Sequence, residues 1–293
     1  MNPRREALIF LAFAAPNLIL FAVFNWWPVL YNTYVSLTDW RLPADHGAFV
    51  GIANYRTLLS DTEFWRVVAN TFIYAGAVVI IAQTAAFVLA LLLNRDMPGS
   101  RIFGAITFAP YITTTAAAAI VWVLLLDPKI GPLSAVYSAL NVEGPYWLRD
   151  NRLALWAIVI VGAWKEIGIA TLFFLAGMRN LPCDCYDAAA IEGAGSWNRV
   201  TRLTLPLMGP VILFLAVSGF VAAVKVFDAV AIMSEGGPSY PASSTFVYHL
   251  YVTAFRDYRF GEGAALSMVF LVFMTAFAYG QFRLGRRWVH YGD

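Results

Sequence analysis

The sequence predicts an all-α membrane protein with six transmembrane helices. Hydrophobic residues make up 60% of its 293 residues, charged residues only 13%, and the mean hydropathy is +0.66. Soluble globular proteins carry about 25% charged residues, so this composition is typical of a chain that lies in a bilayer. A helix that crosses the hydrocarbon core needs about 20 mainly apolar residues, and six segments of the chain meet that length.

These segments define the expected spans in order. They cover roughly 8–36, 67–93, 102–126, 153–178, 207–230 and 264–282. The first follows Arg4 and Arg5 and is longer than the apolar region of a signal peptide, about 7–15 residues, so we expect it to be retained. No connection between spans is long enough for a soluble domain. The chain, residues 1–293, is therefore predicted to be a single transmembrane domain.

Basic residues predict the orientation of these spans. Lys and Arg are denser in 1–7, 94–101, 179–206 and 283–293 than in the three other connections. Cytoplasmic loops carry such an excess, so both termini are expected in the cytoplasm. Trp26, Trp27 and Trp40 would then lie near the outer interface, where an aromatic belt is typical.

Composition also excludes several functions. The net charge is only +2 and the Arg residues are scattered, so the sequence shows no nucleic-acid footprint. Its three histidines lie far apart, and no metal site is expected. Cys183 and Cys185 cannot form a disulfide framework, and we expect them to be reduced thiols in a cytoplasmic loop.

The connection 179–206 is polar and rich in small residues. On a helix, residues three and four apart share a face, so Ala189 and Gly193 would lie on one nearly bare side. A bare side lets another protein approach closely, and Asp187 and Glu192 would leave acidic ends for basic groups of that partner. Composition alone equally fits an ordinary interfacial helix between two spans.

The spacing of residues in this loop is more specific. Asp187-Ala188-Ala189, Gly193, Leu203 and Leu205-Pro206 follow the pattern Glu-Ala-Ala, three residues, Gly, nine residues, Ile, one residue, Leu-Pro, with two mild substitutions. The chain thereby resembles the sugar-type ABC importer permeases of the maltose and glycerol-3-phosphate group. The resemblance assigns coupling to an ATPase to Asp187, Ala188, Ala189, Glu192, Gly193, Leu205 and Pro206.

Other segments follow the order of that family. They include Trp27-Pro28, Ala109-Pro110-Tyr111, Trp164-Lys165 and the Gly236-Gly237-Pro238 turn. The C-terminal residues 287–292 are similar to those of glycerol-3-phosphate permeases in particular. The resemblance therefore extends over nearly the whole chain.

The resemblance implies a type I ABC importer transmembrane domain in a bacterial inner membrane, with a cytoplasmic coupling helix in 179–206. Its implied partners are a second homologous permease, two ATP-binding cassette ATPases and an extracytoplasmic solute-binding protein. The chain would be non-catalytic and without cofactors, because ATP and Mg²⁺ would bind the ATPases. The sequence contains no G-x-x-x-x-G-K-[ST] motif, which agrees. The cargo would be a sugar or a sugar phosphate such as glycerol 3-phosphate.

Polar residues inside the spans suggest a substrate path. Lys165 and Glu166 lie near the middle of span four, where ionisable groups are costly and usually face a cavity or a partner helix. Adjacent helical residues diverge by about 100°, so either could line the path while the other pairs with a neighbouring helix. Lys225 and Asp228 are three apart, and we expect either local pairing or snorkelling to the interface. Trp122 and Thr114 complete the candidate path.

Other functions would leave different patterns. An ion-driven secondary transporter would show repeated halves and helices broken at matching positions, which we do not find. A membrane enzyme would need clustered ligands or a nucleophile–base pair. An amino-acid or metal importer permease stays open within the ABC class, but the Gly-Gly-Pro turn and the six-span layout favour sugars.

Overall fold

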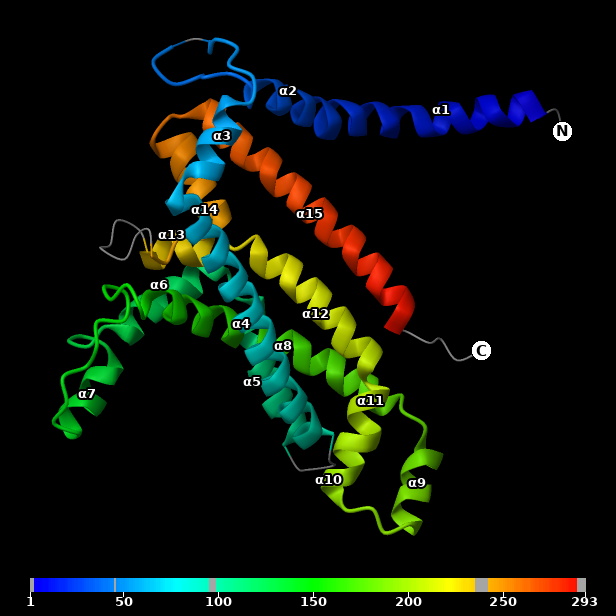
Figure 1. The fold of residues 1–293 in the computed structure, drawn as a ribbon. Coiled ribbons are helices and arrows are strands. Elements are labelled where there is room, and N and C mark those ends of the chain that lie inside the picture. Colours follow the sequence, from blue (N-terminus) through cyan, green and yellow to red (C-terminus); the bar gives the residue numbers. More distant parts are fainter. Residues whose placement is uncertain (1–2, 45, 95–98, 235–241, 289–293) are drawn as a thin grey trace. The chain divides into compact units, whose positions relative to one another are not determined.

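The computed structural model describes residues 3–44, 46–94, 99–234 and 242–288. Within these ranges every regular element is helical, apart from one isolated antiparallel bridge between Thr38 and Phe49 (Figure 1). The chain divides into two compact units, Met1–Phe64 with Leu250–Thr275 and Trp65–His249 with Ala276–Asp293. A single-domain organisation stays a prediction.

The first unit begins with a long apolar helix. α1 (Pro3–Phe21) continues through a π-helical turn (Ala22–Trp26) into α2 (Trp27–Val35). Pro28, in the first turn of α2, has no N–H to donate to the preceding turn, which favours this local change of helical pitch. From Phe10 to Val35 the helix is long and apolar enough to cross a membrane, and no residue of its most apolar window is buried within the chain.

The same unit contains a clasp of hydrogen bonds around residues 36–42. The Asn54 amide, in α3 (Ala53–Ser60), donates to the carbonyls of Ser36 at 2.8 Å and Thr38 at 2.7 Å. The carboxylate of Glu262, near the start of α15 (Phe260–Trp288), accepts from Arg41 and Arg259. These bonds fix the connection that follows α2 to the first turn of α15.

The second unit is built around α8 (Ala154–Arg179), the helix that buries the most residues. It packs with α4 (Thr62–Leu93), α5 (Ser100–Ile112) and α12 (Gly209–Val224). Alanines 86 and 90 of α4 face Phe174 and Met178 of α8 in one buried cluster. Small side chains let membrane helices approach closely, which explains this alanine-rich contact.

Shorter helices complete the chain. They are α6 (Thr115–Leu126), α7 (Pro132–Ala139), α13 (Asp228–Ser234), α14 (Phe246–Tyr251) and the π-helical turn Val252–Arg256.

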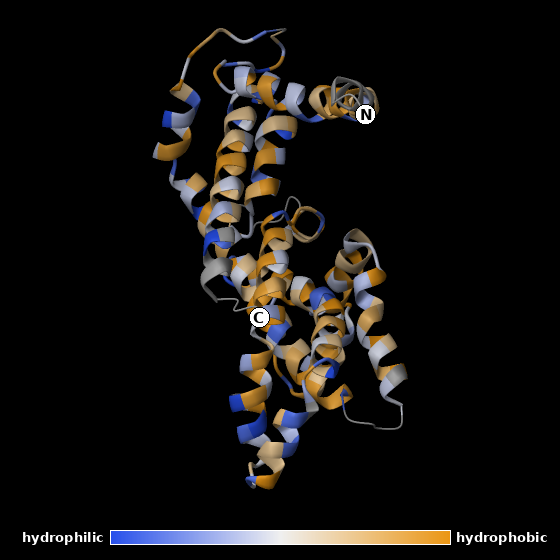
Figure 2. Cartoon of the chain, turned by 90° about the vertical axis from the view of Figure 1, so that its right-hand side faces the viewer, coloured by the Kyte–Doolittle hydropathy of each residue, from blue (hydrophilic) through white to orange (hydrophobic). Residues whose placement is uncertain are grey.

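Among the described residues, four helices are long and apolar enough to cross a membrane, and two bent helix pairs raise the number to six. Figure 2 shows apolar residues along most of the length of the long helices. These four to six candidate spans are consistent with the expected all-α membrane fold.

The third expected span, 102–126, is not one helix. α5 and α6 meet at an angle of 101°. Thr113 and Thr114 between them are extended, and the Thr114 hydroxyl caps α6 by accepting from the N–H of Ala117 at 3.3 Å. Pro110 has no N–H to bond to the preceding turn, and a threonine cap then starts a new helix in another direction.

The fifth expected span, 207–230, also differs. α12 ends at Val224, and Asp228 begins a separate helix, α13. Lys225 and Asp228 therefore do not share a helix, and these two described side chains form no ion pair with each other. Local pairing, one of the two expectations, was wrong because it assumed one continuous helix.

Candidate functional site

The segment expected to couple to an ATPase, residues 179–206 and hereafter the coupling loop, lies between α8 and α12, at one end of the second unit (Figure 1). Its elements are α9 (Cys183–Ile191), α10 (Ser196–Arg199), a π-helical turn (Val200–Thr204) and α11 (Leu205–Leu207). Pro182 occupies the N-cap of α9, where a missing N–H costs little. The sequence therefore builds a short helix between two turns of chain.

Gly193 ends α9. Its φ is +75°, a left-handed conformation that glycine adopts without steric cost. The Gly193 N–H donates to Ala190 O at 3.1 Å and the Ala194 N–H to Ala189 O at 2.9 Å. This pair of bonds is a Schellman motif, which satisfies the last carbonyls of a helix.

The loop presents an exposed surface. Asp187, Ala188, Ala190, Glu192 and Gly193 are all exposed, and Ala189 is half-buried. The sequence predicts that Gly193 shares a bare helical face with Ala189. This prediction was wrong, because α9 ends at Ile191 and Gly193 lies beyond the helix. Asp187 lies in the middle of α9 rather than at its end. The small residues are nevertheless accessible to another protein.

Two large apolar side chains flank this surface, and the sequence analysis missed both. Ile191 is 88% exposed and Trp197 is 77% exposed. Isolated exposed apolar residues are ordinary, but two beside an alanine-rich helix form an apolar rim suited to a protein contact. The sequence feature that could have identified them is the presence of an Ile and a Trp in a loop of otherwise small and polar residues.

Leu205 and Pro206 lie in α11, before the fifth span begins. The segments Ser196–Leu207 and Gly209–Val224 meet at 62°. On the loop side of this bend, the hydroxyls of Tyr186 and the buried Thr204 lie 2.9 Å apart and tie α9 to the following turn. The bend thus separates the loop from the span.

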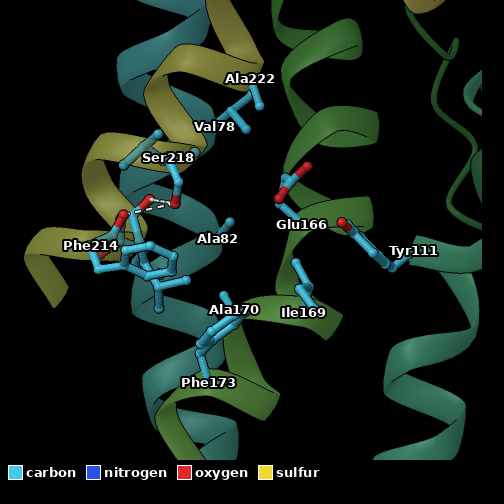
Figure 3. Close-up of a pocket in the computed structure, with 14 residues that line it drawn as sticks. Val78, Ala82, Tyr111, Glu166, Ile169, Ala170, Phe173, Phe214, Ser218 and Ala222 are labelled. Carbon is cyan, nitrogen blue, oxygen red and sulfur yellow. Dashed lines mark hydrogen bonds between the residues drawn. The ribbon is translucent and has the colours of Figure 1, made fainter. Parts of the chain in front are cut away.

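The second candidate site lies along α8, where Glu166 lines two cavities. The first, about 310 Å³, also contains Gln83, Tyr111 and Ser218, and Figure 3 shows the carboxylate of Glu166 beside Tyr111. Ser218 donates to Phe214 O at 2.7 Å, so its hydroxyl oxygen remains able to accept. The described structure gives Gln83 Nε2 no hydrogen-bond partner. Free polar groups thus face aromatic and aliphatic walls.

The second cavity, about 390 Å³, is more polar. Its lining includes Tyr74, Lys165, Glu166, Lys225 and Asp228. Two cationic and two anionic side chains therefore face one space, with Glu166 common to both cavities.

Lys165 also forms a hydrogen bond at the break between α5 and α6. Its Nζ donates to Thr113 O at 2.6 Å, at the C-terminal end of α5. A cation there is favoured by the helix dipole, and it pairs a carbonyl that the break leaves without a helical partner.

Trp122 and Thr114 do not line either cavity. The Trp122 ring packs edge-on against Trp164 at 5.6 Å, and Thr114 is the cap of α6. Thr115 lines the second cavity instead. Sequence reasoning did not select Tyr111, Tyr74 or Ser218, because neutral hydroxyls are common in packed membrane helices.

Two expectations lie outside the described residues: the Gly236-Gly237-Pro238 turn and most of 287–292. Among the described residues, no group of three or more His, Cys, Asp or Glu side chains could hold a metal ion.

Comparison with known proteins supplies independent information. The glycerol-3-phosphate transport system permease protein UgpA of Agrobacterium fabrum is 31% identical over 95% of this chain and 94% of its own. The trehalose/maltose transport system permease protein MalF of Thermococcus litoralis is 30% identical over 96% and 95%.

The fold is also that of a solved chain. One chain of a bacterial alginate ABC transporter, crystallised in complex with an alginate pentasaccharide-bound periplasmic protein, superposes with a TM-score of 0.84. It is 20% identical, over 97% of this chain and 96% of its own. Residues 82–288 match the family described as binding-protein-dependent transport system inner membrane component. The exposed loop, the spans and these similarities agree: the chain belongs to that family of ABC importer permeases.

Proposed function

We propose that this chain is the non-catalytic permease subunit of an ATP-driven importer of sugars or sugar phosphates, glycerol 3-phosphate among them. A second homologous permease would complete the path, two ATPases would bind ATP and Mg²⁺, and an extracytoplasmic binding protein would deliver the cargo. Support for the substrate class comes from relatives named for glycerol 3-phosphate and for trehalose and maltose. A secondary transporter is disfavoured by the family match.

The observation that carries the proposal is the exposed α9 with its flanking Ile191 and Trp197. In the proposed orientation both termini and this loop face the cytoplasm. ATP-driven closure of the ATPases would push on α9, and the bend before α12 would transmit the movement to the spans.

Coupling is tested at Gly193. An added Cβ there meets no atom within 4 Å, so a side chain at this position begins in open space, although it strains the backbone at φ +75°. We expect it to abolish substrate-stimulated ATP hydrolysis while membrane insertion remains normal. Gly193→Asn is the matched control, because Asn tolerates the left-handed conformation at lower cost. Stimulated hydrolysis at the native rate in Gly193→Leu excludes docking at this position.

The partners are tested by purifying the chain from its own cells in a mild detergent and identifying co-purifying proteins by mass spectrometry. We expect an ATPase, a second permease and a binding protein. A chain that emerges alone, under conditions that preserve other importers of this family in the same extract, contradicts the proposal.

For the substrate path we propose Lys165 and Glu166, with Trp122 and Thr114 beside them. Support comes from Glu166, which lines both cavities, and from Lys165, which lines the second. Trp122 and Thr114 have structural contacts instead, so Glu166 is the stronger candidate.

A further inference from the structure

A third cavity, of about 720 Å³, lies between the coupling loop and the ends of α4 and α8. One side is aliphatic, formed by Val88, Leu91 and Leu92 of α4. The other side is basic and polar, with Arg179 at the end of α8, Arg199 at the end of α10 and Asn94. The cavity is therefore amphipathic.

Donors on the polar side have no hydrogen-bond partner among the described residues. Arg199 Nε is buried, and the described residues offer it no hydrogen bond. A buried donor without a partner costs free energy and is uncommon in native proteins. The side chains of Arg179 and Asn94 likewise form no hydrogen bond with a described residue. Several donors of the described residues thus line one space without a hydrogen bond to a described acceptor.

Asp187 is the acidic side chain that lines this cavity. It is exposed and forms no ion pair with Arg179 or Arg199 in the described structure. Two guanidinium groups against one carboxylate leave the cavity with a net positive charge. It therefore favours an anion, despite Asp187.

We propose that this cavity binds the phosphate group of an anionic phospholipid, with an acyl chain along the aliphatic side of α4. The planar guanidinium fork of arginine matches phosphate geometry. Basic pockets between helix ends on the cytoplasmic side of a membrane suit lipid head groups. The assignment rests on the proposed function for the cytoplasmic position of the loop.

A lipid in this position would link α9 to the spans. Tyr186 and Thr204, which are hydrogen-bonded to each other, both line the cavity. The occupant would thus contact the loop that couples to the ATPase and the ends of two spans, so the lipid composition of the membrane would influence coupling.

The test is native mass spectrometry of the purified full-length chain in detergent, titrated with dioleoyl phosphatidylglycerol or dioleoyl phosphatidylcholine. We expect the native chain to retain phosphatidylglycerol in preference. Each arginine removed, in Arg179→Gln or Arg199→Gln, should weaken retention about fivefold. Arg202→Gln is the matched control, because Arg202 is an exposed arginine of the same loop that does not line the cavity. Arg199→Lys, which keeps the charge, should weaken retention less than Arg199→Gln.

Two results overturn the proposal. One is equal retention of phosphatidylglycerol by the native chain and by the double variant of Arg179 and Arg199, at an unchanged melting temperature. The other is an arginine-dependent rise in melting temperature with inorganic phosphate alone, to which phosphatidylglycerol adds nothing, since the ligand is then free phosphate. Retention of phosphatidylglycerol by a chain that recruits no ATPase would keep this site and overturn only the proposed function.

Discussion

The contribution of a charged residue to the stability of this chain depends on how deeply its side chain is buried. The side chain of Glu262 is 8% exposed and accepts from both Arg41 and Arg259. Asp257 pairs with Arg259 as well, at 3.0 Å, but its side chain is 44% exposed. Removing a buried carboxylate from two cationic partners therefore costs more than removing one partner of an exposed ion pair.

These two carboxylates give a matched prediction. Glu262→Gln should lower the free energy of unfolding by about 2 kcal/mol, because it leaves charged partners of a buried group without an anion. Asp257→Asn should lower it by less than about 1 kcal/mol. Thermal unfolding of the two purified variants in detergent measures the difference. Equal melting temperatures of the two variants would show that the ion pairs of Glu262 with Arg41 and Arg259 do not stabilise this region.

Lys165 and Glu166 are adjacent, but we predict different roles for them. We expect Glu166→Gln to weaken apparent substrate affinity in transport assays by about tenfold, since a charge-assisted hydrogen bond contributes about 1.5–3 kcal/mol. Lys165→Met should instead lower thermal stability, because Thr113 O loses its donor. If Glu166→Gln transports with native affinity and turnover, Glu166 does not line the path.

One glycine of α8 allows the backbones of α5 and α8 to approach closely. A Cβ on Gly168 of α8 would lie 2.5 Å from Thr107 O and 2.9 Å from Phe108 Cα, both atoms of the α5 backbone. Backbone atoms cannot move aside as a flexible side chain can, so glycine permits this close approach. Gly104, on α5, faces open space instead.

We therefore expect Gly168→Ala to destabilise the protein by about 1–3 kcal/mol, the usual cost of an overpacked contact. Gly104→Ala should be neutral or slightly stabilising, because alanine favours helix. Both variants add one methyl group to the same helix pair. Melting temperatures in detergent test the expectation, and an equal change in both variants would mean that the close approach at Gly168 does not set the effect.

For the whole molecule, the orientation in the membrane remains a proposal with a direct test. Cys185 is exposed on α9, so in the Cys183→Ser variant it is the single cysteine that reports on the coupling loop. A membrane-impermeant maleimide should label it in inverted membrane vesicles but not in intact spheroplasts.

Ser138→Cys, in α7, serves as the opposite marker in a chain that carries Cys183→Ser and Cys185→Ser. The orientation places α7 on the outer face, so this thiol should be labelled in intact spheroplasts. Labelling of Cys185 from outside would reverse the topology.

The sequence by itself determined the membrane character, the all-α fold and the family. These follow from composition, from runs of about 20 apolar residues and from the fixed spacing of Asp187 to Pro206, which are all local features of the chain. The coupling function of those residues stays a prediction, as does the substrate path.

Only the tertiary structure decided the details on which the sites depend. It broke the third span at Thr113 and Thr114, separated Lys225 from Asp228 and turned Glu166 toward two cavities. Each of these depends on which neighbouring helix supplies a donor, an acceptor or space for a side chain. Sequence periodicity describes one helix at a time, whereas a cavity or a break is settled by several helices packed together.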